Sequence, residues 1–290
     1  MTQHHQSQRY VLNTSCPDTI GIARAVMNFI YDLGGGIVDT SQFVDVYNDH
    51  YFMRTDFNGV MRELPDLATI QDMFAPIAAE FGMTYQFHDV HRPPRVLIAV
   101  SKHGHCLNDL LFRWEAGELN ADIAGVVSNH EDMRAKVEWH GLPYHYLPVT
   151  PDTKAEQEAA VLHLIEEQNV ELLVLARYMQ ILSPGLCKVL RGRAINIHHS
   201  FLPGFKGARP YHQAYERGVK VIGATAHYVT EDLDDGPIIE QDTQRVEHYH
   251  SPEDLVRTGR DIENIVLARA VNWHCTRRVM LNGNRTVVFK

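Results

Sequence analysis

Short, continuous apolar runs constrain the fold of the longer, C-terminal part of this chain. The runs are residues 96–100, 123–127, 170–176 and 194–198. A strand that is apolar on both of its faces belongs in a sheet that is covered on both sides. Strands that alternate with helices predict an α/β fold with a mostly parallel sheet.

The segments between these runs complete the α/β pattern. Helices are expected at residues 107–114, 133–139 and 154–168, and a short strand at residues 144–147. An Asn-Gly turn at residues 282–283 predicts a C-terminal hairpin. Its two strands are expected at residues 279–281 and 286–289.

The N-terminal part follows a different order: strand, helix, strand, strand, helix, strand. The strands are expected at residues 10–12, 37–46, 51–57 and 83–87, and the helices at residues 17–33 and 67–81. The first helix is expected to open at Pro17-Asp18-Thr19 and to end at the glycines of residues 34–36, because glycine adopts the left-handed cap conformation freely. This βαββαβ order predicts a ferredoxin-like domain.

Two prolines separate these two patterns. Pro93 and Pro94 stiffen the chain and cannot continue a helix or a central strand. We therefore predict a domain at residues 1–88, a linker at residues 89–94 and a second domain at residues 95–290.

Composition excludes several classes of protein. The 290 residues include 27 Lys and Arg against 36 Asp and Glu, so the net charge is −9. This balance argues against a nucleic-acid partner, because phosphate contacts need clustered basic residues. We expect no membrane span, because no apolar run approaches about 18 residues, and no secretion signal. The cysteines have no paired spacing, which favours reduced thiols and a cytoplasmic location; they are Cys16, Cys106, Cys187 and Cys275.

Asn196 and His198 are the most informative pair of polar residues. They lie two apart in an expected strand, so their side chains project from one face near its C-terminal end. Open α/β sheets bind their ligands at that end. A side-chain amide can donate to a developing oxyanion, and an imidazole can move protons near neutral pH. This pair is suited to attack on an acyl carbon, although Asn-x-His on a strand also fits a structural role.

Two further stretches could complete such a site. Residues 227–239 place several carboxylates, among them Asp234, in a loop before Gly236-Pro237. A carboxylate near an imidazole would favour its charged form and orient a water molecule. Residues 176–184 mix apolar side chains with Arg177 after a buried strand, and could line a pocket for a flat, partly apolar ligand. A solvated acidic loop and a segment of core are the structural alternatives.

Together and in this order, these three stretches resemble the folate-dependent formyltransferase family. The resemblance spans about residues 95–280 and rests on Asn196-Ile197-His198, on Leu202-Pro203 and on the loop that contains Asp234. It implies a catalytic trio of Asn196, His198 and Asp234. It also implies other site residues, in two groups: a folate-binding group of Arg177, Met179, Ile181, Leu182 and Thr230, and a supporting group of His227, Thr225 and His199.

The N-terminal domain resembles an ACT domain. The resemblance rests on the βαββαβ order and on Cys16 to Gly21 at the first strand-helix turn. It implies either a small amino-acid effector or association of subunits into a homo-oligomer. A ferredoxin-like module that only mediates association is the alternative, because fold alone does not give function.

Three functions are compatible with these features. The first is hydrolysis of 10-formyltetrahydrofolate. The resemblance favours it, because an ACT-like domain is joined to the catalytic domain and because His199 follows the catalytic histidine. Water is then the acceptor, and the products are formate, which can supply purine synthesis, and tetrahydrofolate. The second is formyl transfer to an amine, as in glycinamide ribonucleotide formyltransferase, where a glycine-rich loop cradles the acceptor's phosphate; residues 101–107 retain only Gly104. The third is a folate or amino-acid sensor without activity.

Neither a metal nor a tightly bound cofactor is expected, and the folate is expected to be the substrate. The 18 histidines include His103 with His105, His198 with His199, and His248 with His250. No HExxH motif or cysteine-supported spacing accompanies them. The identity of the general base, His198 or Asp234, stays open at this point, because coupled groups titrate together.

Overall fold

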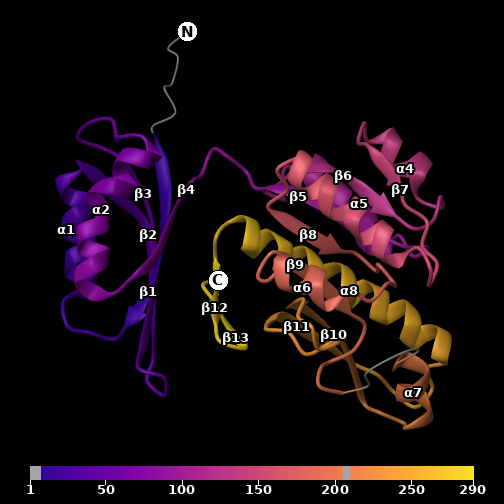
Figure 1. Cartoon of the computed structure of the whole chain (residues 1–290). Coiled ribbons are helices and arrows are strands. Elements are labelled where there is room, and N and C mark those ends of the chain that lie inside the picture. Colours follow the sequence, from indigo (N-terminus) through magenta and orange to yellow (C-terminus); the bar gives the residue numbers. More distant parts are fainter. Residues whose placement is uncertain (1–7, 205–209) are drawn as a thin grey trace. The chain divides into compact units, whose positions relative to one another are not determined.

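The computed structural model describes residues 8–204 and 210–290, and these form two compact units (Figure 1). The N-terminal unit comprises residues up to Arg92 together with Thr276–Met280 and Val287–Lys290. The C-terminal unit comprises Pro93–Cys275 and Leu281–Thr286. Each unit has its own sheet.

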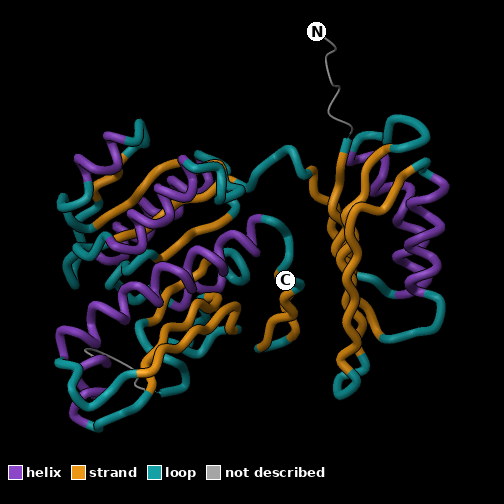
Figure 2. Tube along the Cα trace, turned by 180° about the vertical axis from the view of Figure 1, so that it is seen from behind, coloured by secondary structure: helices purple, strands orange, loops and turns teal. Residues whose placement is uncertain are grey.

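The N-terminal unit is an antiparallel sheet with two helices on one face (Figure 2). Its elements are β1 (Arg9–Pro17), α1 (Ile22–Asp32), β2 (Gly35–Asp45), β3 (His50–Gly59), α2 (Leu67–Phe81) and β4 (Thr84–Asp89). The strand order is β2-β3-β1-β4. Aromatic rings fill the core between sheet and helices, including Phe29, Phe57, Phe74 and Phe87. The expected βαββαβ order and the ACT-like architecture are confirmed.

The first helix begins later than the sequence predicted. Pro17 is the last residue of β1, where it lies opposite His50 of β3. The long ladder between these two strands keeps residues up to Pro17 extended, and Gly21 precedes the helix with φ 104°. The helix therefore starts at Ile22, not at residues 17–19. Gly34 ends it with φ 79°, as expected, but residues 35 and 36 belong to β2.

The C-terminal unit is a seven-stranded sheet with helices on both faces (Figure 1). Its order is β11-β10-β9-β8-β5-β6-β7. The strands are β5 (Arg95–Val100), β6 (Asp122–Ser128), β7 (Tyr144–Tyr146), β8 (Leu172–Leu175), β9 (Ala194–His198), β10 (Val221–Tyr228) and β11 (Ile238–Arg245). The pairs among β5 to β9 are parallel, whereas β10 runs antiparallel to both its neighbours. The predicted mostly parallel sheet is confirmed.

Six helices belong to this unit among the residues that the structure describes. They are α3 (His105–Glu115), α4 (Arg134–Trp139), α5 (Lys154–Glu167), α6 (Pro184–Val189), α7 (Pro210–Glu216) and α8 (Pro252–Cys275). The first three were expected. The long α8 was not predicted, although a capping box marks its start in the sequence. Ser251 Oγ accepts from the Asp254 amide at 3.2 Å, and Asp254 Oδ2 accepts from the Ser251 amide at 3.0 Å.

The C-terminal hairpin forms as expected, with β12 (Val279–Asn282), β13 (Arg285–Val288) and Gly283 at φ 61°. Its flanking segments belong to the N-terminal unit, whereas the sequence had assigned all of residues 95–290 to the second domain. Arg54 Nη2 donates to the carbonyl of Thr276 at 3.3 Å, and Asn13 Nδ2 donates to that of Arg277 at 3.1 Å. These long-range hydrogen bonds explain the difference, because no local pattern announces them.

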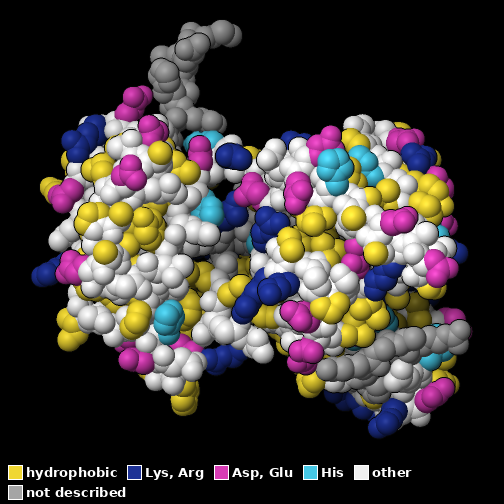
Figure 3. Space-filling model, in the orientation of Figure 1, with side chains coloured by type: hydrophobic (Ala, Val, Ile, Leu, Met, Phe, Trp, Pro, Cys, Tyr) yellow, Lys and Arg dark blue, Asp and Glu magenta, His cyan; other side chains and the backbone are white. Residues whose placement is uncertain are grey.

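The distribution of surface charge and the state of the cysteines agree with what the composition predicted. Figure 3 shows acidic and basic side chains interspersed on the face in view. All four cysteines are buried free thiols. Across the described part of the chain, no helix combines the length and apolarity that a membrane crossing needs.

Candidate active site

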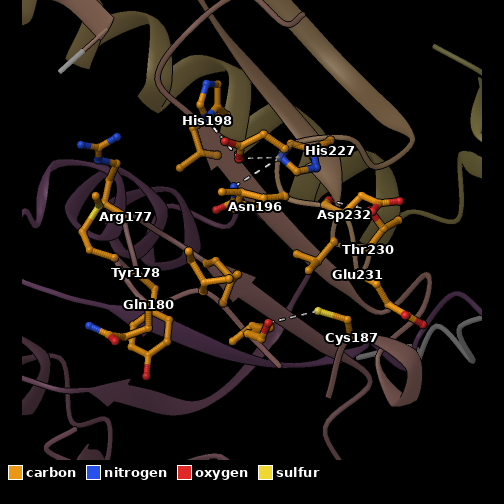
Figure 4. Close-up of a pocket in the computed structure, with 18 of the residues that line it drawn as sticks. Arg177, Tyr178, Gln180, Cys187, Asn196, His198, His227, Thr230, Glu231 and Asp232 are labelled. Carbon is orange, nitrogen blue, oxygen red and sulfur yellow. Dashed lines mark hydrogen bonds and ion pairs between the residues drawn. The ribbon is translucent and has the colours of Figure 1, made fainter. Parts of the chain in front are cut away.

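Asn196 and His227 meet across two neighbouring strands. They lie opposite each other in the β9–β10 register, so their side chains share one face of the sheet. His227 Nδ1 lies 2.9 Å from the carbonyl of Tyr228, and a carbonyl only accepts, so this nitrogen carries a proton. Burial lowers the pKa of His227 and keeps the ring neutral. Its Nε2 therefore accepts from Asn196 Nδ2 at 3.3 Å, which turns the amide nitrogen of Asn196 toward the site (Figure 4).

His198 and Asp234 form an ion pair beside this amide. His198 ends β9, and its Nδ1 lies 3.2 Å from Oδ1 of Asp234. Burial alone would raise the pKa of Asp234, but the hydrogen bond from His198 and the nearby imidazoles outweigh it, so the pKa falls below its usual value. Asp234 is therefore a carboxylate at neutral pH. The other ring nitrogen of His198, Nε2, is buried and has no hydrogen-bond partner among the residues that the structure describes.

The loop between β10 and β11 brings Asp234 into place. Asp234 has a φ of 55°, in the left-handed region that non-glycine residues seldom adopt. Nearby, a Cβ at Gly236 would lie 1.7 Å from the Tyr228 carbonyl oxygen, so only glycine allows this close packing. The amide of Tyr228 donates to the carbonyl of Pro237 at 2.9 Å, which closes the loop. Gly236 is thus a backbone requirement for the loop that places the carboxylate.

The trio opens onto a cavity of about 270 Å³. All five residues that the sequence analysis assigned to folate binding line it: Arg177, Met179, Ile181, Leu182 and Thr230. Asn196, His198 and Asp234 line it as well, together with His199 and His227. The lining combines apolar side chains with the polar groups of the trio, as small-molecule pockets generally do.

Thr225 lies outside the cavity and supports the chain beside it. Its hydroxyl donates to the Ser200 carbonyl at 2.8 Å, and accepts from the Leu202 amide at 3.1 Å and from Gln241 Nε2 at 2.9 Å. These bonds fix the turn that follows β9. Thr230, in contrast, uses its hydroxyl within its own loop and donates to the carbonyl of Asp232 at 3.0 Å.

Arg177 lines the cavity, and its guanidinium contacts two side chains of the same unit. Its Nη1 contacts Nδ1 of His199, and its Nε lies 3.5 Å from a carboxylate oxygen of Glu263 on α8. Glu263 was not among the predicted site residues, because the helix that carries it was not predicted from the sequence. A glutamate among the inward-facing positions of an amphipathic helix was the available signal.

One group of described residues has the composition of a metal site. Ligand atoms of His105, Cys106 and Glu263 lie within 4.8 Å of one another. Here His105 Nε2 and Glu263 Oε2 already hydrogen-bond at 2.8 Å, and Arg177 supplies a positive charge. An ion-pair network accounts for these contacts, and the expectation of a metal-free reaction stays a prediction.

Comparisons with known proteins agree with this geometry. A family model described as "Formyl transferase" matches residues 94–271. The fold and the site therefore define a formyl transferase domain. Over 283 residues the chain is 50 % identical to formyltetrahydrofolate deformylase of Corynebacterium sp. (strain P-1), covering 97 % of this chain and 98 % of that protein. The same-named Escherichia coli (strain K12) protein is 41 % identical over 284 residues, or 98 % of this chain and 99 % of that protein.

Solved structures separate two kinds of neighbour. A formyltetrahydrofolate deformylase from Pseudomonas syringae superposes with a TM-score of 0.95 at 47 % identity, covering 99 % of this chain and 96 % of that one. A glycinamide ribonucleotide transformylase from Symbiobacterium toebii gives 0.64 at 28 % identity, covering 68 % of this chain and 95 % of that one. The chain belongs to the formyltetrahydrofolate deformylase family.

Proposed function

We propose that this chain hydrolyses 10-formyltetrahydrofolate to formate and tetrahydrofolate, with water as the formyl acceptor. One observation carries the proposal: an amide, an imidazole and a carboxylate converge on one cavity in a chain that matches deformylases over nearly its whole length. Formyl transfer to an amine has less support, because the transformylase neighbour covers only 68 % of this chain.

The folate would lie against the apolar side chains that line the cavity. Met179 and Ile181 both line the cavity and are 54 % and 59 % exposed. The Met179 amide is already bonded to Ser101 Oγ at 3.0 Å, which fixes the segment. A flat, partly apolar ring that covered these side chains would be stabilised by removing them from water.

Asn196 is suited to stabilise the oxyanion. His227 accepts one of the two protons of its amide nitrogen, and the second remains for the formyl oxygen. As water adds to the formyl carbon, negative charge develops on that oxygen. A donor already oriented toward it stabilises the transition state more than the ground state.

His198 is suited to move the proton. Its Nδ1 donates to Asp234, so the buried Nε2 keeps a lone pair that no described residue uses. Nε2 takes a proton as the water oxygen bonds to the formyl carbon. It then gives a proton to the folate nitrogen as the carbon–nitrogen bond breaks. Asp234 orients the ring and stabilises its charged form, so we assign the general base to His198.

An assay without any amine tests the proposed reaction. Purified protein is mixed with 10-formyltetrahydrofolate in amine-free buffer, and formate and tetrahydrofolate are quantified. We expect equal amounts of both products from the wild type. Folate binding without formate would contradict hydrolysis and favour a transferase that lacks its acceptor. Metal analysis of the same sample tests the expectation that no metal is needed.

The N-terminal unit is proposed to join copies of the chain and to bind a small amino acid. Its edge strand β2 exposes Ile37, Val38 and Phe43, and Val46 and Tyr47 follow it; Figure 3 shows further apolar side chains on this unit. Exposed strand edges and apolar surface favour pairing of sheets. Light scattering checks association, and a monomer would contradict it. Calorimetric titration with the common amino acids tests for an effector. No heat of binding with any of them would contradict this part of the proposal. A cytoplasmic location stays a prediction.

A further inference from the structure

A buried carboxylate on α8 joins separate segments of the C-terminal unit. Glu263 is 1 % exposed. Its Oε2 accepts from His105 Nε2 at 2.8 Å, and its Oε1 accepts from the Tyr211 hydroxyl at 2.8 Å. Burial raises the pKa of Glu263, but the hydrogen bond from His105 and the charge of Arg177 outweigh it and lower the pKa below its usual value. Glu263 is thus a buried anion with partners on several sides.

The helix is shaped to admit one of these partners. A Cβ at Gly259 would lie 2.1 Å from the ring of Tyr211, so the absence of a side chain there makes room for the tyrosine. Glycine inside a helix is destabilising relative to alanine. Gly259 lies one turn before Glu263. The room that it leaves for Tyr211 therefore comes at a cost in helix propensity.

Arg177 is the charged partner that reaches the active site. It follows β8 with a φ of 63°, a left-handed conformation that residues with a Cβ seldom adopt. Its carbonyl accepts from the Ser101 amide at 3.2 Å, which fixes the backbone there. Strained conformations of this kind persist where the surrounding structure holds them in place.

The contact between Arg177 and His199 determines the protonation of His199. A guanidinium only donates, so Nδ1 of His199 must accept and its proton must lie on Nε2. The His199 ring lies 5.2 Å from that of His198 and 6.2 Å from that of Tyr211, measured between centroids. The charged groups that face His199 are Arg177, Glu263, His198 and Asp234.

We propose that Glu263 is a positioning residue for the reaction: it holds the guanidinium of Arg177 against His199, and this fixes His199 in its Nε2–H form beside the catalytic His198. The proposal rests on the proposed function for its kinetic part only. Burial, followed by the charge of Arg177, lowers the pKa of His199 to about 3. His199 therefore stays neutral at physiological pH, and His198 can take up its proton without a second imidazolium at its side.

The test compares two variants of the same helix. Glu263→Gln removes the buried charge and keeps the side-chain shape, whereas Asp261→Asn removes an exposed carboxylate two residues away. The full-length protein is labelled with ¹⁵N-histidine, and the His199 signals are assigned by their loss in His199→Gln. Nitrogen shifts report the tautomer without any substrate, and kcat and KM are measured on 10-formyltetrahydrofolate.

We expect wild type and Asp261→Asn to show only the Nε2–H form of His199 between about pH 5 and about pH 9. In Glu263→Gln the guanidinium loses its anchor, the second tautomer appears, and kcat falls about tenfold with KM nearly unchanged. A proton on Nδ1 in the wild type, or unchanged tautomer and kcat in Glu263→Gln, would overturn the proposal. The proposal would also be overturned if the wild-type protein held one metal ion per chain and Glu263→Gln lost that ion.

A proton on Nδ1 of His199 in the wild type would overturn the proposal even if Glu263→Gln does not fold. Tyr211→Phe then removes one partner of Glu263 and leaves its charge, and a partial loss of the single tautomer is expected. Failure of the proposed function is a different result, because wild-type protein would then release no formate while the His199 signals could still match the expected form.

Discussion

Replacing Asp234 with Asn lowers kcat by on the order of 10³-fold to 10⁴-fold, while the folate still binds. The amide keeps the volume of the carboxylate but removes the charge that faces His198 Nδ1 at 3.2 Å. An asparagine can also donate to that nitrogen, which favours the tautomer whose proton lies on Nε2. The lone pair that should accept the proton from water is then lost. Rapid-quench measurement of formate release checks kcat, and fluorescence titration with the folate checks binding.

Asp242→Asn is the matched control for this variant. Asp242 lies on the neighbouring strand β11, where it forms an ion pair with Arg269 at 3.2 Å outside the cavity. Exposed pairs of this kind contribute about 0–1 kcal/mol to stability, so its activity should stay close to that of the wild type. Turnover of Asp234→Asn within a few fold of the wild type would remove Asp234 from the mechanism.

Replacing His198 with Gln lowers kcat by on the order of 10⁴-fold, because both the acceptor and the donor of the transferred proton are lost. Glutamine fills much of the same space, so the cavity and folate binding should persist. The decrease should be similar at all pH values, since no other group takes over the proton. Kinetics across the pH range, with folate binding measured in parallel, test this.

His248→Gln serves as the control, because His248 lies in the exposed segment after β11 and does not line the cavity. Residual activity in His198→Gln above about one hundredth of the wild type would show that another group carries the proton. Combining this variant with Asp234→Asn should give little further loss, because the two residues act as one unit.

The sequence by itself predicted the architecture of both units and the three residues, Asn196, His198 and Asp234, that the structure brings together at one cavity. Period-2 and helical spacing are local properties, so β9 was placed at residues 194–198 and α2 at residues 67–81 with the bounds that the structure has. The Asn-x-His spacing puts Asn196 and His198 on one face of a strand wherever that strand lies. Glycine and proline before β11 likewise marked the loop that presents Asp234.

Only the tertiary structure decided which partners these residues have. The contact between Asn196 and His227 depends on the register of an antiparallel pair, and the network around Glu263 depends on how α8 lies against segments more than fifty residues away. The return of residues 276–280 to the N-terminal unit depends on hydrogen bonds from Asn13 and Arg54. The spacing of residues along a chain determines local secondary structure. The tautomer of a buried imidazole depends instead on neighbours that only the folded chain brings together.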